Sequence, residues 1–189
     1  RAVPTSMVPG EKLSKTQPFP SKPPAFEMQG LTEGDLIDFT PELRQEALEV
    51  MANYDMGPLF NPPIHSDDPA GKIASAMCPG DGGGANINNP PLADPTSGFL
   101  YVTSRKACSW QRIIPGEEAD ARIEAPTGST FAAFANGSRA RVPRLASGLP
   151  YFKPPYSTIT AYDMNTGDIA FQIPTGETPD RFRNNPALE

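Results

Sequence analysis

Several residue types that would direct this sequence to a particular class of protein are scarce. Lysine and arginine number 16 against 22 acidic residues, so the net charge is −6. A protein that binds nucleic acid needs a basic surface to meet the phosphates, so the composition argues against nucleic acid as a partner. The longest uninterrupted apolar run is Phe131 to Ala135, whereas a membrane-spanning helix needs about 20 apolar residues. We therefore expect no transmembrane segment.

Cysteine and histidine are also rare. Cys78 and Cys108 are the two cysteines, too few for a disulfide scaffold and without the spacing of metal ligands. Two unpaired thiols and one disulfide are equally open at this point, and a disulfide would close a loop of about 30 residues in an oxidising compartment. The one histidine, His65, stands beside Ser66 and two aspartates in a predicted coil. We interpret it as a surface residue, and we predict no catalytic residue and no metal site.

Proline, by contrast, is abundant. It makes up 24 of the 189 residues, whereas an average protein has about 5%. Because proline cannot donate a hydrogen bond to a helix or a sheet, much of the chain should be turns and extended coil. Residues 1–30 contain six prolines and no hydrophobic periodicity. We predict an extended proline-rich arm lying on a surface, with a free disordered tail as the alternative.

Residues 31–82 are predicted to be a coil insertion that contains one short helix, over about 41–53. Thr40 suits the N-cap, and Pro41 suits the first helical position. Four apolar residues then fall on one helix face: Leu43, Ala47, Val50 and Met51. We interpret this face as a packing surface rather than a cofactor site.

Two similar segments predict β-hairpins. Asp94 is followed four residues later by Gly98, and Asp163 is followed in the same way by Gly167. The aspartate can bond the turn backbone, and the glycine can take the left-handed position of a bulged hairpin loop. The two aspartates are 69 residues apart, as are the two glycines. This spacing favours a repeat architecture, although a chance similarity of two hairpins is the alternative.

The fold class predicted from these features is mainly β. Among all-β repeats, a propeller blade of four short strands joined by turns fits best. We predict an incomplete β-propeller of about two blades over residues 83–189, with an insertion near 105–147. Within that insertion, Ser109 to Ile114 is predicted to form a strand that contains Trp110.

Specific motifs extend this reading to a known family. The segment Ala161-x-Asp163-x-Asn165-Thr166-Gly167 resembles the blade signature of the pyrroloquinoline-quinone (PQQ)-dependent quinoprotein dehydrogenases. Gly83-Gly84-Ala85-Asn86, followed by Asp94-Pro95-x-x-Gly98-x-Leu100-Tyr101-Val102, is similar to a second run in that family. The resemblance covers nearly the whole chain in family order and is weakest over 105–145.

The resemblance implies a cofactor and a cellular location. Members of the family are periplasmic or membrane-associated, have an eight-bladed propeller, and oxidise alcohols or sugars with PQQ bound beside a calcium ion. Asn86 resembles a residue that contacts PQQ in the family, although Ile87 stands where the family has tryptophan. The alternative for Asn86 is a turn asparagine that bonds the local backbone.

The resemblance also implies that parts of the family enzyme are missing. The stretch with the catalytic aspartate and the strand with the PQQ-contacting lysine would precede Arg1, and the closing blades would follow Glu189. We therefore expect a segment of a PQQ-dependent alcohol or sugar dehydrogenase, inactive alone and binding neither PQQ nor calcium by itself. Its partner would be the remainder of the propeller.

The alternative is an accessory structural subunit derived from such a propeller. It would dock on a larger periplasmic or membrane-bound complex. In both cases we expect a periplasmic location, at the membrane surface if a partner holds the chain there.

Overall fold

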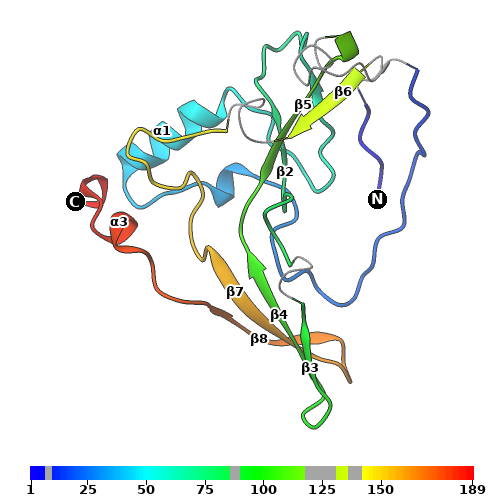
Figure 1. Ribbon diagram of the computed structural model, residues 1–189, viewed down its shortest axis with the longest axis vertical. Coiled ribbons are helices and arrows are strands. Elements are labelled where there is room, and N and C mark those ends of the chain that lie inside the picture. The colour runs from blue at the N-terminus through cyan, green and yellow to red at the C-terminus, as the bar shows by residue number, and fades with distance from the viewer. Residues whose placement is uncertain (7–9, 86–89, 118–130, 136–141) are drawn as a thin grey trace.

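The computed structural model describes residues 1–6, 10–85, 90–117, 131–135 and 142–189 (Figure 1). Within these ranges the chain is mainly β, as predicted, with two sheets and short helices. The strands are β1 (Ile64–His65), β2 (Ser75–Met77), β3 (Leu92–Asp94), β4 (Phe99–Arg105), β5 (Ser109–Pro115), β6 (Phe131–Ala135), β7 (Ser157–Asp163) and β8 (Asp168–Pro174). The helices are α1 (Pro41–Met51), α3 (Asp180–Arg183) and two 3₁₀ turns, Glu33–Asp35 and Pro186–Leu188.

The first sheet is an antiparallel meander in the order β3-β4-β7-β8. Both predicted hairpins are present, as β3–β4 and β7–β8. In each turn the aspartate carbonyl accepts a hydrogen bond from the glycine N–H, at 2.9 Å for Asp94 and Gly98 and 2.7 Å for Asp163 and Gly167. Both glycines have positive φ angles, 74° and 71°, as the bulged loop requires. The turn chemistry predicted from the sequence is therefore confirmed.

The two hairpins share one sheet instead of belonging to successive blades. Strands β4 and β7 pair from Phe99 with Asp163 to Arg105 with Ser157. The four strands together have the form of one propeller blade. The similarity between the hairpins thus does not support the predicted count of about two blades, because both hairpins lie in one four-stranded sheet.

The chain between β4 and β7 contributes β5 and β6 to the second sheet. In it, β5 pairs with β1 in parallel and with β2 and β6 antiparallel. Strand β5 is the predicted strand that contains Trp110. An insertion within the blade, residues 106–156, therefore pairs with strands that come from before the blade, and Figure 1 shows the second sheet beyond the end of β4.

One hydrophobic core joins helix α1 to this insertion. The helix begins where the sequence predicts, because the Thr40 side chain accepts a hydrogen bond from the backbone N–H of Leu43 at 3.2 Å. Leu43, Ala47 and Met51 are buried on its inner face. They belong to one cluster that combines residues of the predicted insertion 31–82 with residues of the segment 83–189. Its other members include Leu31, Leu36, Ile37, Tyr54, Ala76, Cys78, Trp110, Leu149, Tyr151 and Phe152. No helix in the described ranges is long and apolar enough to cross a membrane.

Residues 22–26 of the N-terminal segment lie against strands β7 and β8 of the blade. Tyr162 donates its hydroxyl to the Pro24 carbonyl, and Gln172 donates its side-chain amide to the Phe26 carbonyl at 2.8 Å. Lys22 forms an ion pair of 2.8 Å with Asp168 in the β7–β8 hairpin. Three side chains of the blade therefore hold this segment against β7 and β8.

The ion pair between arm and blade gives a prediction about pH. The hydrogen bond from Lys22 lowers the pKa of Asp168 below its ordinary value of 3.8. Because the folded-state pKa is depressed, the stabilisation by this pair is complete above pH 3.8 and is lost as the pH falls through the lowered value. We expect Lys22→Ala to return the pKa of Asp168 toward 3.8 in a carbon-13 NMR titration of the carboxyl group.

A second aspartate provides the control for that titration. The pKa of Asp94 is also lowered, but by the hydroxyl of Ser97 and the backbone of the same turn. It should keep its value in Lys22→Ala. A Lys22→Ala protein in which the Asp168 titration is unchanged would contradict the contact between arm and blade.

Candidate functional site

The segment that leads to Asn86 is a glycine-rich loop fastened to the start of the insertion. It leaves β2 at Cys78 and runs beside residues 105–109. Gly80 donates its N–H to the Ala107 carbonyl at 2.9 Å. Gly84 and Arg105 exchange two backbone hydrogen bonds of 2.8 and 3.2 Å, an isolated antiparallel bridge. The backbone just before Asn86 is therefore fixed against the end of blade strand β4.

Two glycines allow this close approach. A Cβ atom added to Gly80 would collide with the backbone nitrogen of Ser109, and one added to Gly83 would collide with the carbonyl oxygen of Ala107. In both cases the obstacle is backbone, which cannot rotate out of the way. Gly80 and Gly83 are thus needed for the packing of the loop against residues 107–109.

This packing gives a matched pair of substitutions. Gly83→Ala should lower the free energy of unfolding by about 1–3 kcal/mol, because the added methyl group overpacks a backbone contact. Gly82→Ala is the control, since its Cβ would meet no atom within 4 Å. Urea denaturation of both variants measures the difference. Equal stabilities would show that the loop does not pack as described.

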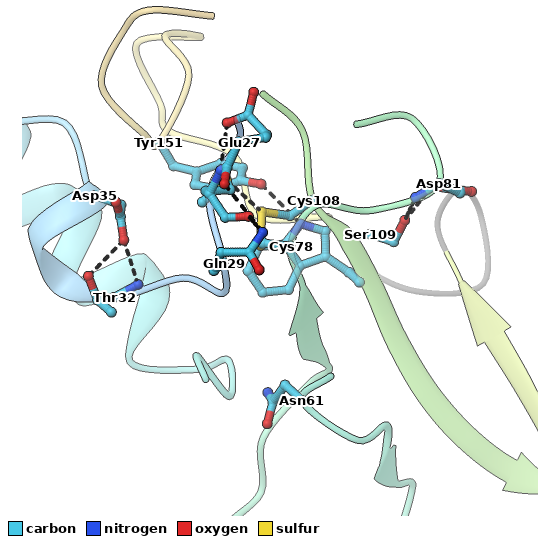
Figure 2. The surroundings of a disulfide bond; sticks show 12 residues. Glu27, Gln29, Thr32, Asp35, Asn61, Cys78, Asp81, Cys108, Ser109 and Tyr151 are labelled. Carbon is cyan, nitrogen blue, oxygen red and sulfur yellow. Dashed lines mark hydrogen bonds between the residues drawn. A yellow bond between two sulfur atoms is a disulfide. The ribbon is translucent and has the colours of Figure 1, made fainter. Parts of the chain in front are cut away.

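A disulfide between Cys78 and Cys108 fixes the base of the loop (Figure 2). Of the two states that the sequence leaves open for these cysteines, the structure contains the bridged one. Cys78 is fully buried, and its carbonyl accepts a hydrogen bond from Gly30 N–H at 2.9 Å. The sulfur of Cys108 lies 3.9 Å from the sulfur of Met28. The disulfide thus connects the loop, the insertion and the end of the arm at one point.

A hydrogen-bonded pair holds the middle of the loop. The Asp81 backbone N–H donates to the Ser109 hydroxyl oxygen at 2.8 Å, and the Ser109 hydroxyl donates to the Asp81 carboxylate (Figure 2). Ser109 is fully buried at the start of β5. The Asp81 carboxylate therefore holds the glycine-rich loop against the start of β5. This pair could not be predicted from the sequence, because Asp81 and Ser109 are 28 residues apart. The one local indication is that Ser109 directly follows Cys108, whose disulfide brings it to the loop.

The core beneath the disulfide is aromatic. Trp110 is completely buried, its ring centroid is 4.8 Å from that of Tyr54, and its indole N–H donates to the Tyr151 hydroxyl at 3.3 Å. Burial raises the pKa of Tyr151 to about 12. This phenol is consequently protonated at neutral pH, and it supports the loop without acting as a base.

The residues singled out from the sequence are not brought together in one place. Asn86 lies outside the described residues, as do 87–89. The side chain of His65 is 15% exposed, more buried than expected of a surface residue, and its Nδ1 atom accepts a hydrogen bond from Asp67 N–H at 3.1 Å. Within the described ranges, no three His, Cys, Asp or Glu residues form a group that could hold a metal ion. The described geometry is a disulfide-linked, hydrogen-bonded loop whose described residues end just before Asn86.

Known proteins resemble the chain over nearly its whole length. The quinate/shikimate dehydrogenase (quinone) of Acinetobacter baylyi is 31% identical over 184 residues, which cover 92% of this chain and 22% of that protein. A probable quinate dehydrogenase (quinone) of Xanthomonas campestris pv. juglandis is 27% identical over 178 residues, which cover 90% and 22%. The chain therefore spans about a fifth of the length of these curated relatives. No solved structure matches it.

A protein family also matches, described as the β-propeller domain of the PQQ-type glucose/ethanol/alcohol dehydrogenases, and the match covers residues 1–188. The resemblance predicted from the hairpin and glycine motifs is thus confirmed. The four-stranded meander agrees with it, since propeller blades are built in this way. The chain belongs to the PQQ-dependent glucose/ethanol/alcohol dehydrogenase family and lies within its β-propeller domain.

Proposed function

We propose that this chain supplies one blade and its insertion to a periplasmic PQQ-dependent dehydrogenase that oxidises a hydroxylated ring carboxylate such as quinate or shikimate. The observation that carries the proposal is the 31% identity to a quinate/shikimate dehydrogenase across 92% of the chain. A second relative is also named for quinate. The proposed substrate class is therefore narrower than the alcohol or sugar expected from the sequence, namely hydroxylated ring acids.

The open face of the blade supports a role as part of a larger propeller. The strand register places Leu92, Tyr101, Ala161 and Phe171 in one row across the four strands. Leu92 is 68% exposed and Phe171 is 40% exposed. Ile173, two residues along the same face, is 49% exposed. Ala161, within the row, is buried, so the exposed apolar side chains lie on the two outer strands of this face. Exposed apolar side chains gathered on one face are typical of an interaction surface, and the remainder of the propeller is its proposed partner.

The described residues do not fit the family's metal ion. Calcium takes about six to eight oxygen ligands, largely carboxylates and carbonyls, and no acidic cluster occurs in the described ranges. PQQ supplies the redox chemistry when it is bound, and the protein around it supplies position and polarity. We therefore propose that the chain alone binds neither group and has no dehydrogenase activity.

The same open face favours a second candidate function. An accessory subunit derived from a propeller would use the apolar row from Leu92 to Phe171 to dock on a larger periplasmic or membrane-bound complex. This candidate predicts stable association with a separate dehydrogenase, and no activity in any product of its own reading frame.

Enzyme assays separate these proposals. The complete reading frame that encodes the chain should be expressed, supplied with PQQ and calcium, and assayed for dye-linked oxidation of quinate, shikimate, glucose and ethanol. We expect oxidation of the two ring acids by the complete product and none by the 189-residue chain. Oxidation of glucose or ethanol only would overturn the substrate class. An inactive product that co-purifies with a separate dehydrogenase would favour the accessory subunit.

A further inference from the structure

A cavity of about 750 Å³ lies at one end of the blade. It forms where β4 and β8 end and β7 begins, and it is also lined by residues from 150–156 and from the C-terminal segment around α3. Figure 1 shows the chain leaving β8 toward α3 at this end. Ligand pockets for small molecules typically measure about 300–1,000 Å³. The cavity is therefore large enough for a ring-sized ligand.

Positive charge gathers in this cavity although the chain as a whole is acidic. Arg105, Lys106 and Arg181 all line it. Among the described residues that line it, the single acidic side chain is Glu177, which forms an ion pair of 2.7 Å with Arg183. The cavity thus has a surplus of cations within a chain of net charge −6. Such a surplus favours an anionic ligand.

The rest of the lining combines aromatic rings with hydroxyl groups. The ring of Tyr156 lies 6.0 Å from that of Phe152 and 6.4 Å from that of Phe182. Burial raises the pKa of Tyr156, so its phenol stays protonated at neutral pH and can donate a hydrogen bond. The hydroxyls of Ser157 and Thr175, which bond each other, also line the cavity. Apolar walls with a few polar groups are typical of sites for small organic molecules.

The cavity adjoins the loop that leads to Asn86. Arg105, which lines the cavity, is the residue that exchanges two backbone hydrogen bonds with Gly84. The backbone N–H of the next residue, Lys106, donates to the Tyr156 carbonyl at 2.8 Å. The loop stapled by the disulfide and the wall of the cavity therefore meet at one backbone bridge, which fixes where the Arg105 side chain begins.

We propose that this cavity binds the carboxylate of a small hydroxylated ring acid, with Arg105 as its main cation and the Tyr156 ring against the carbon skeleton. Arginine suits this task because its planar guanidinium matches the two oxygens of a carboxylate. The identity of the ligand rests on the proposed function, whereas the preference for a carboxylate rests on the cavity itself.

Direct binding tests the proposal without enzyme turnover. Quinate, and myo-inositol as an uncharged ring polyol, are titrated into the 189-residue chain and followed by NMR and calorimetry. We expect quinate to bind at least tenfold more tightly than myo-inositol. Arg105→Ala should weaken quinate binding at least tenfold, and Arg105→Lys should weaken it less. Glu177→Gln should tighten it, because an acid leaves the cavity wall.

The matched control is Arg144→Ala, which removes an exposed arginine that does not line the cavity. It should leave quinate binding unchanged. Circular dichroism checks that each variant folds. If Arg105→Ala does not fold, Arg181→Ala tests the preference of the cavity for an anion instead. Arg181 is a second cation of the cavity wall and is exposed near the C-terminal end. Equal binding of quinate and myo-inositol, or no effect of either arginine substitution, would overturn the proposal.

The cavity and the proposed function can fail separately. If the complete protein oxidises quinate while Arg105→Ala changes neither binding to the chain nor KM, the cavity assignment is wrong and the function stands. If the chain binds quinate through Arg105 but the complete protein does not oxidise it, the cavity assignment stands and the function falls. PQQ also carries carboxylates, so it is titrated as well. Binding of PQQ without binding of quinate would assign the cavity to the cofactor and overturn our proposal.

Discussion

A chain in which Cys78 and Cys108 are both replaced by alanine is expected to lose about 3.5 kcal/mol of stability. The bridge closes a sequence separation of 30 residues, and in the chain-entropy model a loop of that length costs the unfolded state about this much freedom. Loss of the bridge should also loosen the glycine loop, because Cys78 is its first residue. For a chain of this size, the melting temperature should fall by about 7–14 °C.

Urea denaturation of the oxidised wild-type chain, the reduced wild-type chain and the double alanine variant measures this loss. Reduction should destabilise the wild type and leave the variant unchanged, which separates the covalent bond from the packing of the two side chains. The change in stability should come with faster hydrogen exchange at Gly80 and Gly84, whose N–H groups bond Ala107 and Arg105. A variant within about 1 kcal/mol of the oxidised wild type would contradict a structural role for the bridge.

The features that the sequence predicted are those set by a few neighbouring residues. Thr40 and Pro41 define the start of α1 through one capping bond and one fixed φ angle. The Asp-to-Gly spacing defines both hairpin turns, since the aspartate bonds the turn and the glycine takes the positive φ angle. Each of these devices works within four residues of chain. The family resemblance was also readable, because it depends on the same motifs.

The pairing of distant segments could not be predicted in the same way. Nothing in the turn of either hairpin specifies that β4 pairs with β7, whose first residues are 58 apart in the sequence. Strand β1 has two residues and β2 has three, too few for any periodicity to identify. These strands exist because the edges of β5 offer them partners. Two hairpins that pair in one sheet therefore had the sequence pattern of two separate repeats.

The proposed binding cavity was missed for the same physical reason. Its cations come from the end of β4 and from α3, and its phenol comes from the loop before β7. Arg105 and Lys106 are adjacent in the sequence, but two basic residues at the end of a strand usually face solvent. What makes them a candidate site is the return of the chain to the same end of the blade, through Tyr156 and again through Arg181. Sheet topology brings these residues together.

Trp110→Ala is expected to be the most destabilising single substitution in the chain. The indole is fully buried, packs edge to face on Tyr54 and Tyr151, and donates to the Tyr151 hydroxyl. Removing such a side chain from a core typically costs about 3–5 kcal/mol, against a total stability of about 5–15 kcal/mol for a domain. Trp110 lies on β5 and packs against Tyr151, so its loss should weaken the contact between the second sheet and the part of the core that contains helix α1.

Two further variants show how that cost divides. Trp110→Phe keeps an aromatic ring but leaves the buried Tyr151 hydroxyl without the indole donor, so we expect it to lose less than the alanine variant and more than about 1 kcal/mol. Phe171→Ala removes an aromatic ring from the open blade face, where it is 40% exposed, and should cost less than about 1 kcal/mol. Circular dichroism during urea denaturation follows all three variants, because the two Trp110 variants lack tryptophan fluorescence. If Trp110→Ala were no more destabilising than Phe171→Ala, the core that packs beneath the disulfide-linked loop would have to be centred on residues other than Trp110.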